Sequence, residues 1–177
     1  DDEVALAIIA NLRTEKRHDV FIEAAKHLHT RRPALRFFIV GDGPHREAVR
    51  SRVAQSGLPT DVLRLLGTRD DVPALLSAMD ISCLCSEKEC FSVTMLEAAA
   101  AGCVFIGPDT GCMTEFLQDG ETGLIIKPAD VASLTDAIDR LANDPPLRQR
   151  LAEHAKTRAV EDFDIIKMAA ACADLCF

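Results

Sequence analysis

The chain alternates between short runs of consecutive apolar residues and longer segments in which apolar residues recur every three or four positions. Continuous apolar runs are typical of parallel strands that are buried on both faces. The wider spacing is typical of helices that bury one face. Six runs predict strands, at residues 4–10, 35–40, 62–66, 81–85, 104–107 and 123–127.

The segments between and after these runs predict helices at residues 19–30, 45–56, 72–79, 91–101, 114–118, 129–143, 145–160 and 165–175. Strand and helix therefore alternate with short connections, which predicts an α/β fold: a Rossmann-like, doubly wound parallel sheet of about six strands with helices on both faces. In such a sheet the ligand binds outside the carboxyl ends of the strands. The loops expected to meet there are 11–16, 41–44, 67–71, 86–92 and 108–114.

Length and composition indicate one soluble globular domain over residues 1–177, long enough to bury a continuous core. The net charge of −8, without a basic run to offset it, argues against nucleic acid as a partner. The sequence has no stretch of about twenty apolar residues that would predict a membrane span. Any membrane contact is therefore expected to be peripheral. The first residues do not have the pattern of a signal peptide.

Seven cysteines, an odd number without a regular framework, indicate a reducing compartment, and we expect a cytoplasmic location. Cys83 and Cys85 alternate on a predicted strand, and Cys172 and Cys176 lie four apart on the last predicted helix, so packing explains them. No CxxC pair or neighbouring histidine predicts a metal site. None of the five histidines has metal or triad spacing, and all are expected on or beside exposed helices: His18, His27, His29, His45 and His154.

The predicted helix 91–101 carries almost no polar residue, so we expect it to be covered on most sides. Its polar exceptions, Thr94 and Glu97, lie three apart and share one stripe near the helix N-terminus. The backbone N–H groups of Ser92, Val93 and Thr94 lack helical partners in the first turn. Such a helix end is suited to binding an anion.

Glu89 stands just before this helix and Glu97 stands inside it. A diphosphate held on the N–H groups would therefore have one carboxylate near each end. One carboxylate could accept hydrogen bonds from ribose hydroxyls, and the other could face a sugar. A simpler explanation remains open on spacing alone, because acidic residues near a helix N-terminus also complement the dipole or cap the helix.

The segment Glu89-Cys90-Phe91-Ser92-Val93-Thr94-Met95-Leu96-Glu97 resembles the signature of the family 4 retaining glycosyltransferases of GT-B architecture, two glutamates separated by seven residues. A run of small residues ending at Gly102 follows it, as is usual in that family. Cys90 stands where the family usually has glycine. The resemblance extends over residues 4–163 and implies one half of a GT-B fold, the C-terminal domain that binds a nucleotide-diphosphate sugar.

The resemblance also implies roles for individual residues. Lys16 would contact the diphosphate, with Arg13 as a second cation, while Glu97 would take the ribose hydroxyls and Glu89 would contact the sugar near its anomeric carbon. Glu89 and Lys16 are thus the candidate catalytic residues. Two cations beside a diphosphate would stabilise the leaving nucleotide without a metal or other cofactor.

The turn that begins at Gly41 is a weak dinucleotide fingerprint, since its third glycine is missing and Pro44 is better explained as the first residue of a helix. By resemblance this turn borders the nucleotide pocket, residues 67–69 lie where the family places the base, and residues 109–115 border the sugar, with Cys112 in place of a usual glycine. The predicted nucleotide-sugar site comprises Arg13, Lys16, Gly41, Thr68, Arg69, Glu89, Phe91, Ser92, Val93, Thr94 and Glu97.

The resemblance implies a retaining hexosyltransferase that uses a donor such as a UDP sugar or GDP-mannose. The acceptor would be bound by an N-terminal domain that this chain does not contain, so we expect the isolated chain to transfer weakly or not at all. Two alternatives remain: another GT-B enzyme, such as a sugar-nucleotide epimerase or a phosphorylase, and a non-catalytic nucleotide-sugar-binding or regulatory domain. The base, the sugar and the acceptor are not determined by the sequence.

Overall fold

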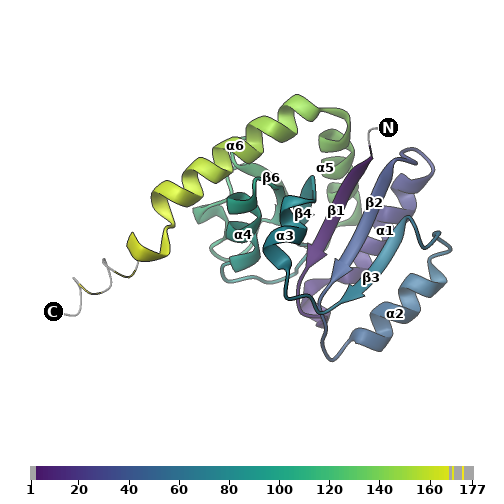
Figure 1. The fold of residues 1–177 in the computed structure, drawn as a ribbon. Helices are drawn as coiled ribbons and strands as arrows, with labels where there is room; N and C mark the ends of the chain where they lie inside the picture. The colour runs from purple at the N-terminus through teal and green to yellow at the C-terminus, as the bar shows by residue number, and fades with distance from the viewer. Residues whose placement is uncertain (1–2, 168, 170–172, 174–177) are drawn as a thin grey trace.

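The computed structural model describes residues 3–167, 169 and 173, and its six strands form one parallel sheet (Figure 1). The order of the strands across the sheet is β3-β2-β1-β4-β5-β6. This order confirms the predicted doubly wound, Rossmann-like fold. The strands are β1 Val4–Ile9, β2 Leu35–Val40, β3 Leu63–Gly67, β4 Ile81–Cys83, β5 Val104–Pro108 and β6 Gly123–Ile126.

Helices cover both faces of the sheet (Figure 1). On one face α1 packs against α2 and α5, and on the other face α4 packs against α3 and α6. The α-helices are α1 His18–His29, α2 Arg46–Gln55, α3 Val72–Ser77, α4 Val93–Ala101, α5 Val131–Asn143 and α6 Pro145–Asp162. Two short 3₁₀ helices are η1 Thr14–Lys16 and η2 Met113–Glu115.

The direction of winding reverses at β1, which pairs in parallel with both β2 and β4. The chain leaves β1 toward α1 on one face and leaves β4 toward α4 on the other face. Because these two strands are neighbours, the loops that follow them start from adjacent carboxyl ends, at the switch point where folds of this kind bind their ligands. The predicted ligand loops 11–16 and 86–92 are these two loops.

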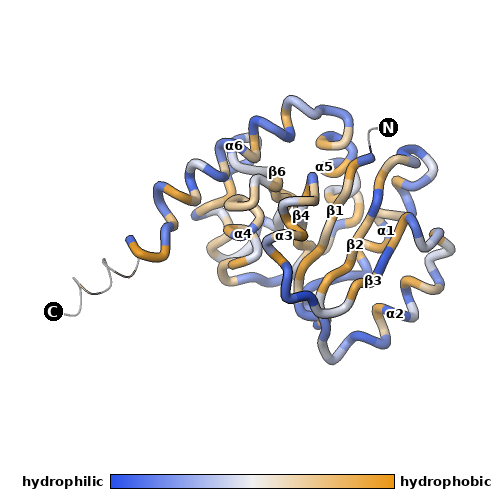
Figure 2. The backbone as a smooth tube through the Cα atoms, in the orientation of Figure 1, coloured by the Kyte–Doolittle hydropathy of each residue, from blue (hydrophilic) through white to orange (hydrophobic). Residues whose placement is uncertain are grey.

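The central strands β1 and β2 are predominantly hydrophobic, as Figure 2 shows. Leu6 and Ile8 of β1 and Phe37 of β2 are completely buried. The ring of Phe21 on α1 meets that of Phe37 edge to face, with centroids 5.7 Å apart. Each such side chain contributes about 1.5–3 kcal/mol when it is fully buried, so the core holds the strand ends, and hence the loops, in fixed positions.

Two predictions about where helices begin are wrong. Helix α4 begins at Val93 rather than at residue 91, because Ser92 is extended and its Oγ caps the helix by accepting from the amide of Met95. Helix α2 begins at Arg46, so Pro44 is not its first residue. The segment before α2 instead forms a turn, in which the amide of Arg46 donates to the carbonyl of Gly43 at 3.0 Å.

Helix α4 is covered on most sides, as expected, but one narrow face is open to solvent. Val93 is 67% exposed, and Glu97 and Ala100 are also exposed. Since these residues are four and three positions apart, they form a single solvent-facing stripe. Met95, Ala98 and Ala99 are buried, so the rest of the helix is covered.

The last predicted helix, 165–175, is helical at residues 165–167 and otherwise lies largely outside the described residues, as do Cys172 and Cys176. Within the part of the chain that the structure describes, no helix combines the length and the apolar character that a membrane crossing requires.

Candidate functional site

Two loops meet at the carboxyl edge of the sheet, one after β1 and one after β4. The amide of Glu87 donates to the carbonyl of Glu15 at 2.9 Å, and Arg17 donates to the carboxylate of Glu87 at 2.5 Å. Arg17 also forms a two-pronged hydrogen bond with Asp19, which raises the pKa of the guanidinium and lowers that of the carboxyl. The contacts of Glu87 with Glu15 and Arg17 therefore join the two loops.

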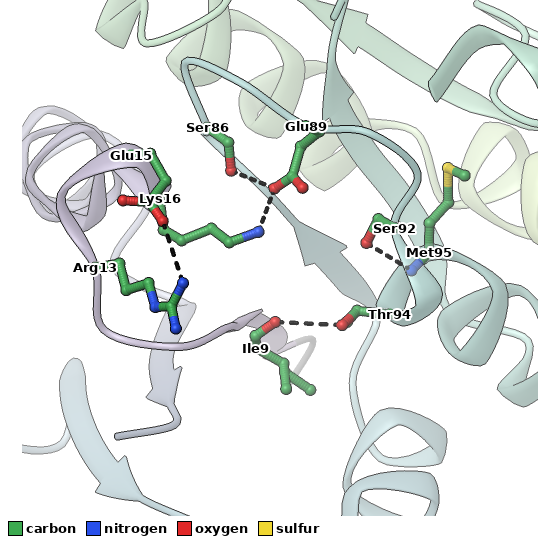
Figure 3. A network of polar contacts seen from close by, with 9 residues as sticks. All are labelled: Ile9, Arg13, Glu15, Lys16, Ser86, Glu89, Ser92, Thr94 and Met95. Atoms are coloured by element: carbon green, nitrogen blue, oxygen red, sulfur yellow. Dashed lines mark hydrogen bonds and ion pairs between the residues drawn. The ribbon is translucent and has the colours of Figure 1, made fainter. Parts of the chain in front are cut away.

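Lys16 and Glu89 form an ion pair between the two loops, with Nζ 2.5 Å from Oε1 (Figure 3). Ser86 donates to the same Oε1 at 2.6 Å. The side chain of Glu89 is only 8% exposed and that of Lys16 20%. Both hydrogen bonds reach one oxygen, so Oε2 of Glu89 has no protein partner among the described residues.

Ser86 is a site residue that the sequence reasoning missed. It is completely buried and lies three positions before Glu89, in the polar turn after β4. A small hydroxyl residue in a polar turn is common, and only its spacing from Glu89 could have indicated that it orients the carboxylate. Its hydroxyl, together with Lys16, holds Oε1 of Glu89 and leaves Oε2 without a partner among the described residues.

The N-terminus of α4 opens beside this ion pair (Figure 3). Ser92 satisfies the amide of Met95 at 3.3 Å, while the amides of Val93 and Thr94 have no protein acceptor within the described residues. The Thr94 hydroxyl lies 3.5 Å from the carbonyl oxygen of Ile9 at the end of β1. The amide of Ser92 has no acceptor within the described residues either, so all three predicted amides are available at the positive end of the helix, and the Ser92 hydroxyl acts as its cap.

The exposed side chain of Glu97 forms no hydrogen bond or ion pair with any residue that the structure describes. Thr94, by contrast, is half-buried against β1, so the two residues share the helix end but differ in environment. In the loop after β3, Thr68 is exposed and Arg69 binds Asp71 through two hydrogen bonds of 2.8 and 2.5 Å. Hydrogen bonding to Asp71 raises the pKa of Arg69 and lowers that of Asp71.

Gly41 follows β2 and lies against the residues at the ends of β1 and β3. Its φ is +133°, and a Cβ at this position would lie 2.0 Å from the carbonyl oxygen of Ala10, so only glycine fits. Its amide donates to the carbonyl of Gly67 at 2.8 Å. Beside it is a pocket of about 330 Å³, lined by Leu12, Gly41, Arg46, Arg50, Leu65, Leu66 and Gly67.

Two predicted site residues lie at the margin. Arg13 is exposed, and its nearest recorded partner is Glu15, at 3.9 Å. The ring of Phe91 stacks on that of Phe163, with centroids 5.8 Å apart, and Phe163 meets Phe116 edge to face at 5.2 Å. This aromatic cluster anchors the loop that leads into α4 against the end of α6.

The loop after β5 packs against the segment that carries Glu89. Gly111 has a φ of +58°, and a Cβ there would lie 1.9 Å from the carbonyl oxygen of Glu89. The amide of Cys112 donates to the carbonyl of Cys90 at 2.7 Å. The predicted sugar loop and the predicted signature loop are therefore in direct backbone contact.

The expectation that every histidine lies near an exposed helix surface is wrong for His18. This first residue of α1 is 3% exposed, because α2 and the loop after β1 cover it, and its Nε2 has no partner within the described residues. Burial lowers its pKa from 6.5 to about 4. Within residues 3–167, 169 and 173, no three His, Cys, Asp or Glu side chains form a group that could hold a metal ion.

The model of a protein family described as glycosyl transferases group 1 matches residues 1–158. Among curated proteins, N-acetyl-alpha-D-glucosaminyl L-malate synthase from Bacillus anthracis is 32% identical over 163 residues, which are 92% of this chain and 42% of that protein. The chain thus spans less than half the length of this relative.

Two solved structures have closely similar folds. HepE from Anabaena, in complex with UDP-glucose, has a TM-score of 0.91 at 22% identity. The match covers 99% of this chain and 49% of the HepE chain. The C-terminal domain of a glycosyl transferase group 1 family protein, LpcC, from Francisella tularensis has a TM-score of 0.83 at 26% identity. This match covers 92% of this chain and 87% of the LpcC domain.

Proposed function

The chain belongs to the group 1 glycosyl transferases, and on that premise we propose that it is the donor-binding part of a retaining glycosyltransferase. Its substrate is a nucleotide-diphosphate sugar, whose glycosyl group passes to an acceptor with retention of the anomeric configuration. The Lys16–Glu89 pair beside the open amides of α4 is the observation that carries this proposal.

The diphosphate binds at the N-terminus of α4 in this proposal. The amides of Val93 and Thr94 point to the phosphate oxygens and the helix dipole favours their negative charge. Lys16 supplies a full positive charge at the same place, and the exposed Arg13 on the same loop adds to the positive potential. These charges stabilise the leaving nucleotide, so that the reaction needs no metal.

Glu97 accepts hydrogen bonds from the ribose hydroxyls. It lies one helical turn after Val93 on the exposed stripe of α4, and its carboxylate has no partner among the described residues. The base lies beside the end of β3, near Gly41, Thr68 and Arg69, where backbone groups read it. Support comes from the same fold in HepE, which binds UDP-glucose.

Glu89 acts on the sugar. Ser86 and Lys16 hold Oε1, and the free Oε2 faces the anomeric carbon, where positive charge develops as the bond to the phosphate breaks. When the donor binds, the ammonium group of Lys16 is shared between Glu89 and the distal phosphate. The same lysine thus aligns the carboxylate and neutralises the leaving group.

The acceptor is bound by a part of the protein outside this chain. The relative from Bacillus anthracis is more than twice as long as the matched segment. In this proposal the second part positions the acceptor and excludes water, so the chain alone binds the donor but transfers sugar slowly or not at all.

Isothermal calorimetry of this chain against UDP, GDP and ADP sugars, GDP-mannose included, tests donor binding. We expect one nucleotide series to bind, with uridine, guanosine or adenosine alone binding much more weakly because they lack the diphosphate. Absence of binding by every series contradicts the proposal. In the full protein, NMR of the product reports anomeric configuration, and binding without transfer to any acceptor favours the non-catalytic alternative instead.

A further inference from the structure

Two exposed cysteines, Cys90 and Cys112, lie against each other in the loops after β4 and β5. The amide of Cys112 donates to the carbonyl oxygen of Cys90 at 2.7 Å. Standard bond lengths along this path place the two Cα atoms less than about 7 Å apart. Disulfide-bonded cysteines have Cα separations of roughly 4.4–6.8 Å, so the backbone is already within bridging range.

The Cys112 thiol also has charged and ionisable groups beside it. The Glu115 carboxylate, as a hydrogen-bond acceptor and a negative charge, raises the pKa of Cys112, and the Cys90 thiol adds to this effect. The remaining cysteines of the described chain, Cys83, Cys85 and Cys103, are buried. Buried thiols are inert toward soluble reagents, so among the cysteines that the structure describes only Cys90 and Cys112 are open to them.

We propose that Cys90 and Cys112 form a redox-active dithiol that reacts with low-molecular-weight disulfides and closes to an intramolecular disulfide. In a reducing compartment such pairs are transient and serve as sensors rather than as permanent staples. This thiol chemistry does not depend on whether the chain transfers sugars.

The reaction proceeds by two exchange steps. The thiolate of Cys90 attacks one sulfur of the external disulfide, forming a mixed disulfide and releasing one thiolate. Cys112 then loses its proton to the Glu115 carboxylate or to water and attacks the sulfur of Cys90, and the second external thiolate leaves. Two protein thiols are oxidised to one disulfide while one external disulfide is reduced to two thiols.

The bridge would fix the segment that carries Glu89. Gly111, next to Cys112, already packs so closely on the carbonyl of Glu89 that no side chain fits between them. Cys90 and Cys112 each directly follow a residue of this contact, Glu89 and Gly111. A disulfide between them would keep the two loops from moving apart.

Peptide mapping of the intact chain tests the proposal. The reduced chain is incubated with oxidised glutathione, free thiols are blocked with an alkylating agent, and the chain is cleaved at glutamate and aspartate residues. Cleavage at Glu97 and Asp109 separates Cys90, Cys103 and Cys112 into three peptides. We expect a Cys90–Cys112 linked peptide in about tenfold excess over any linked pair containing a buried cysteine, and its loss on treatment with dithiothreitol.

Single variants sharpen the result. Cys90→Ser and Cys112→Ser should each abolish the linked peptide and accumulate glutathione on the other cysteine of the pair. Cys103→Ser, a control at a buried position, should keep the link. Glutathione on Cys90 of the unmodified chain without any link to Cys112 would overturn the proposal, as would the absence of modification at both residues. Because the mapping uses the unmodified chain, a variant that fails to fold leaves the test intact.

Discussion

Nζ of Lys16 and Oε1 of Glu89 lie 2.5 Å apart, although 73 positions separate the two residues in the chain. Their contact joins the loop after β1 to the loop after β4 and spans the point where the winding of the sheet reverses. The ion pair therefore helps to hold the two loops together, and the same two residues are proposed to bind the donor.

Replacing Lys16 by alanine should affect both stability and nucleotide binding. Glu89 is 8% exposed and would lose its cation, so we expect urea unfolding to show a loss of about 1–3 kcal/mol. Calorimetry should show at least about tenfold weaker binding of the nucleoside diphosphate, because one charge-assisted hydrogen bond is lost. Lys88→Ala removes the same charge from an exposed neighbour and should change neither quantity. Equal effects of the two substitutions would contradict the assigned role of Lys16.

Glu97→Ala should weaken nucleotide binding without destabilising the chain. The side chain is exposed and has no protein partner among the described residues, so the free energy of unfolding should stay within about 0.5 kcal/mol. Loss of hydrogen bonds to the ribose should cost about 1–3 kcal/mol of binding free energy. Glu121→Ala, at another exposed glutamate, is the control. If Glu97→Ala binds every nucleotide as well as the parent, the ribose assignment is wrong.

Ser92→Ala should show that the cap of α4 also serves the anion site. Loss of the hydrogen bond to the Met95 amide should lower the unfolding free energy by about 1 kcal/mol. Asp144→Ala is the control, because Asp144 caps α6 in the same way, through the amide of Leu147 at 2.9 Å, near Asp80 at the end of the sheet where β4 begins. Both variants should lose similar stability in urea, but only Ser92→Ala should weaken binding of a nucleoside diphosphate.

Gly111→Ala should be more damaging than Gly120→Ala. Both glycines have positive φ, +58° and +73°, so alanine at either costs about 1–2 kcal/mol of backbone strain. Only at Gly111 would the new Cβ overlap another group, the carbonyl of Glu89, whereas nothing lies within 4 Å of a Cβ at Gly120. Urea midpoints should therefore fall further for Gly111→Ala. Equal shifts would show that the two loops do not pack as described.

His18 should make stability depend on pH between about 4 and 6.5. Burial lowers its pKa from 6.5 to about 4, so in this range the unfolded chain binds a proton that the folded chain does not. The unfolding free energy contributed by His18 is therefore fully present above pH 6.5 and is lost as the pH falls toward 4. A full shift of this size corresponds to about 3 kcal/mol.

Urea unfolding at several pH values checks this, with His18→Gln as the comparison because glutamine does not titrate. The difference between the two chains should grow with pH from 4 to 6.5 and then stay constant. Carboxylates that do not interact with His18, such as Asp139, whose pKa is lowered by the hydrogen bond from Arg32, act equally in both chains and cancel. A constant difference across the whole range would show that His18 is not buried in its neutral form.

The six strands could be located from sequence because a strand buried on both faces requires an unbroken apolar run, and β2 was predicted at its observed bounds. The paired glutamates could be found for a similar reason. Glu89 and Glu97 belong to one strand-turn-helix unit, so their spacing along the chain limits their separation in space.

Helix ends and burial were less predictable. The start of α4 depends on the extended backbone of Ser92, and the burial of His18 depends on α2, which packs over it from a distant part of the chain. Neither property is encoded in the local hydrophobic pattern, which was all that the sequence offered at these positions.

Sequence alone determined which residues are buried strands, where the loops fall and which acidic residues flank a helix, because these properties depend on neighbours in the chain. Only the tertiary structure decided that β1 and β4 are adjacent, and with this that Lys16 reaches Glu89 and that Cys112 lies beside Cys90. Such contacts join segments that are distant in sequence, and packing of the whole core fixes them rather than any local pattern.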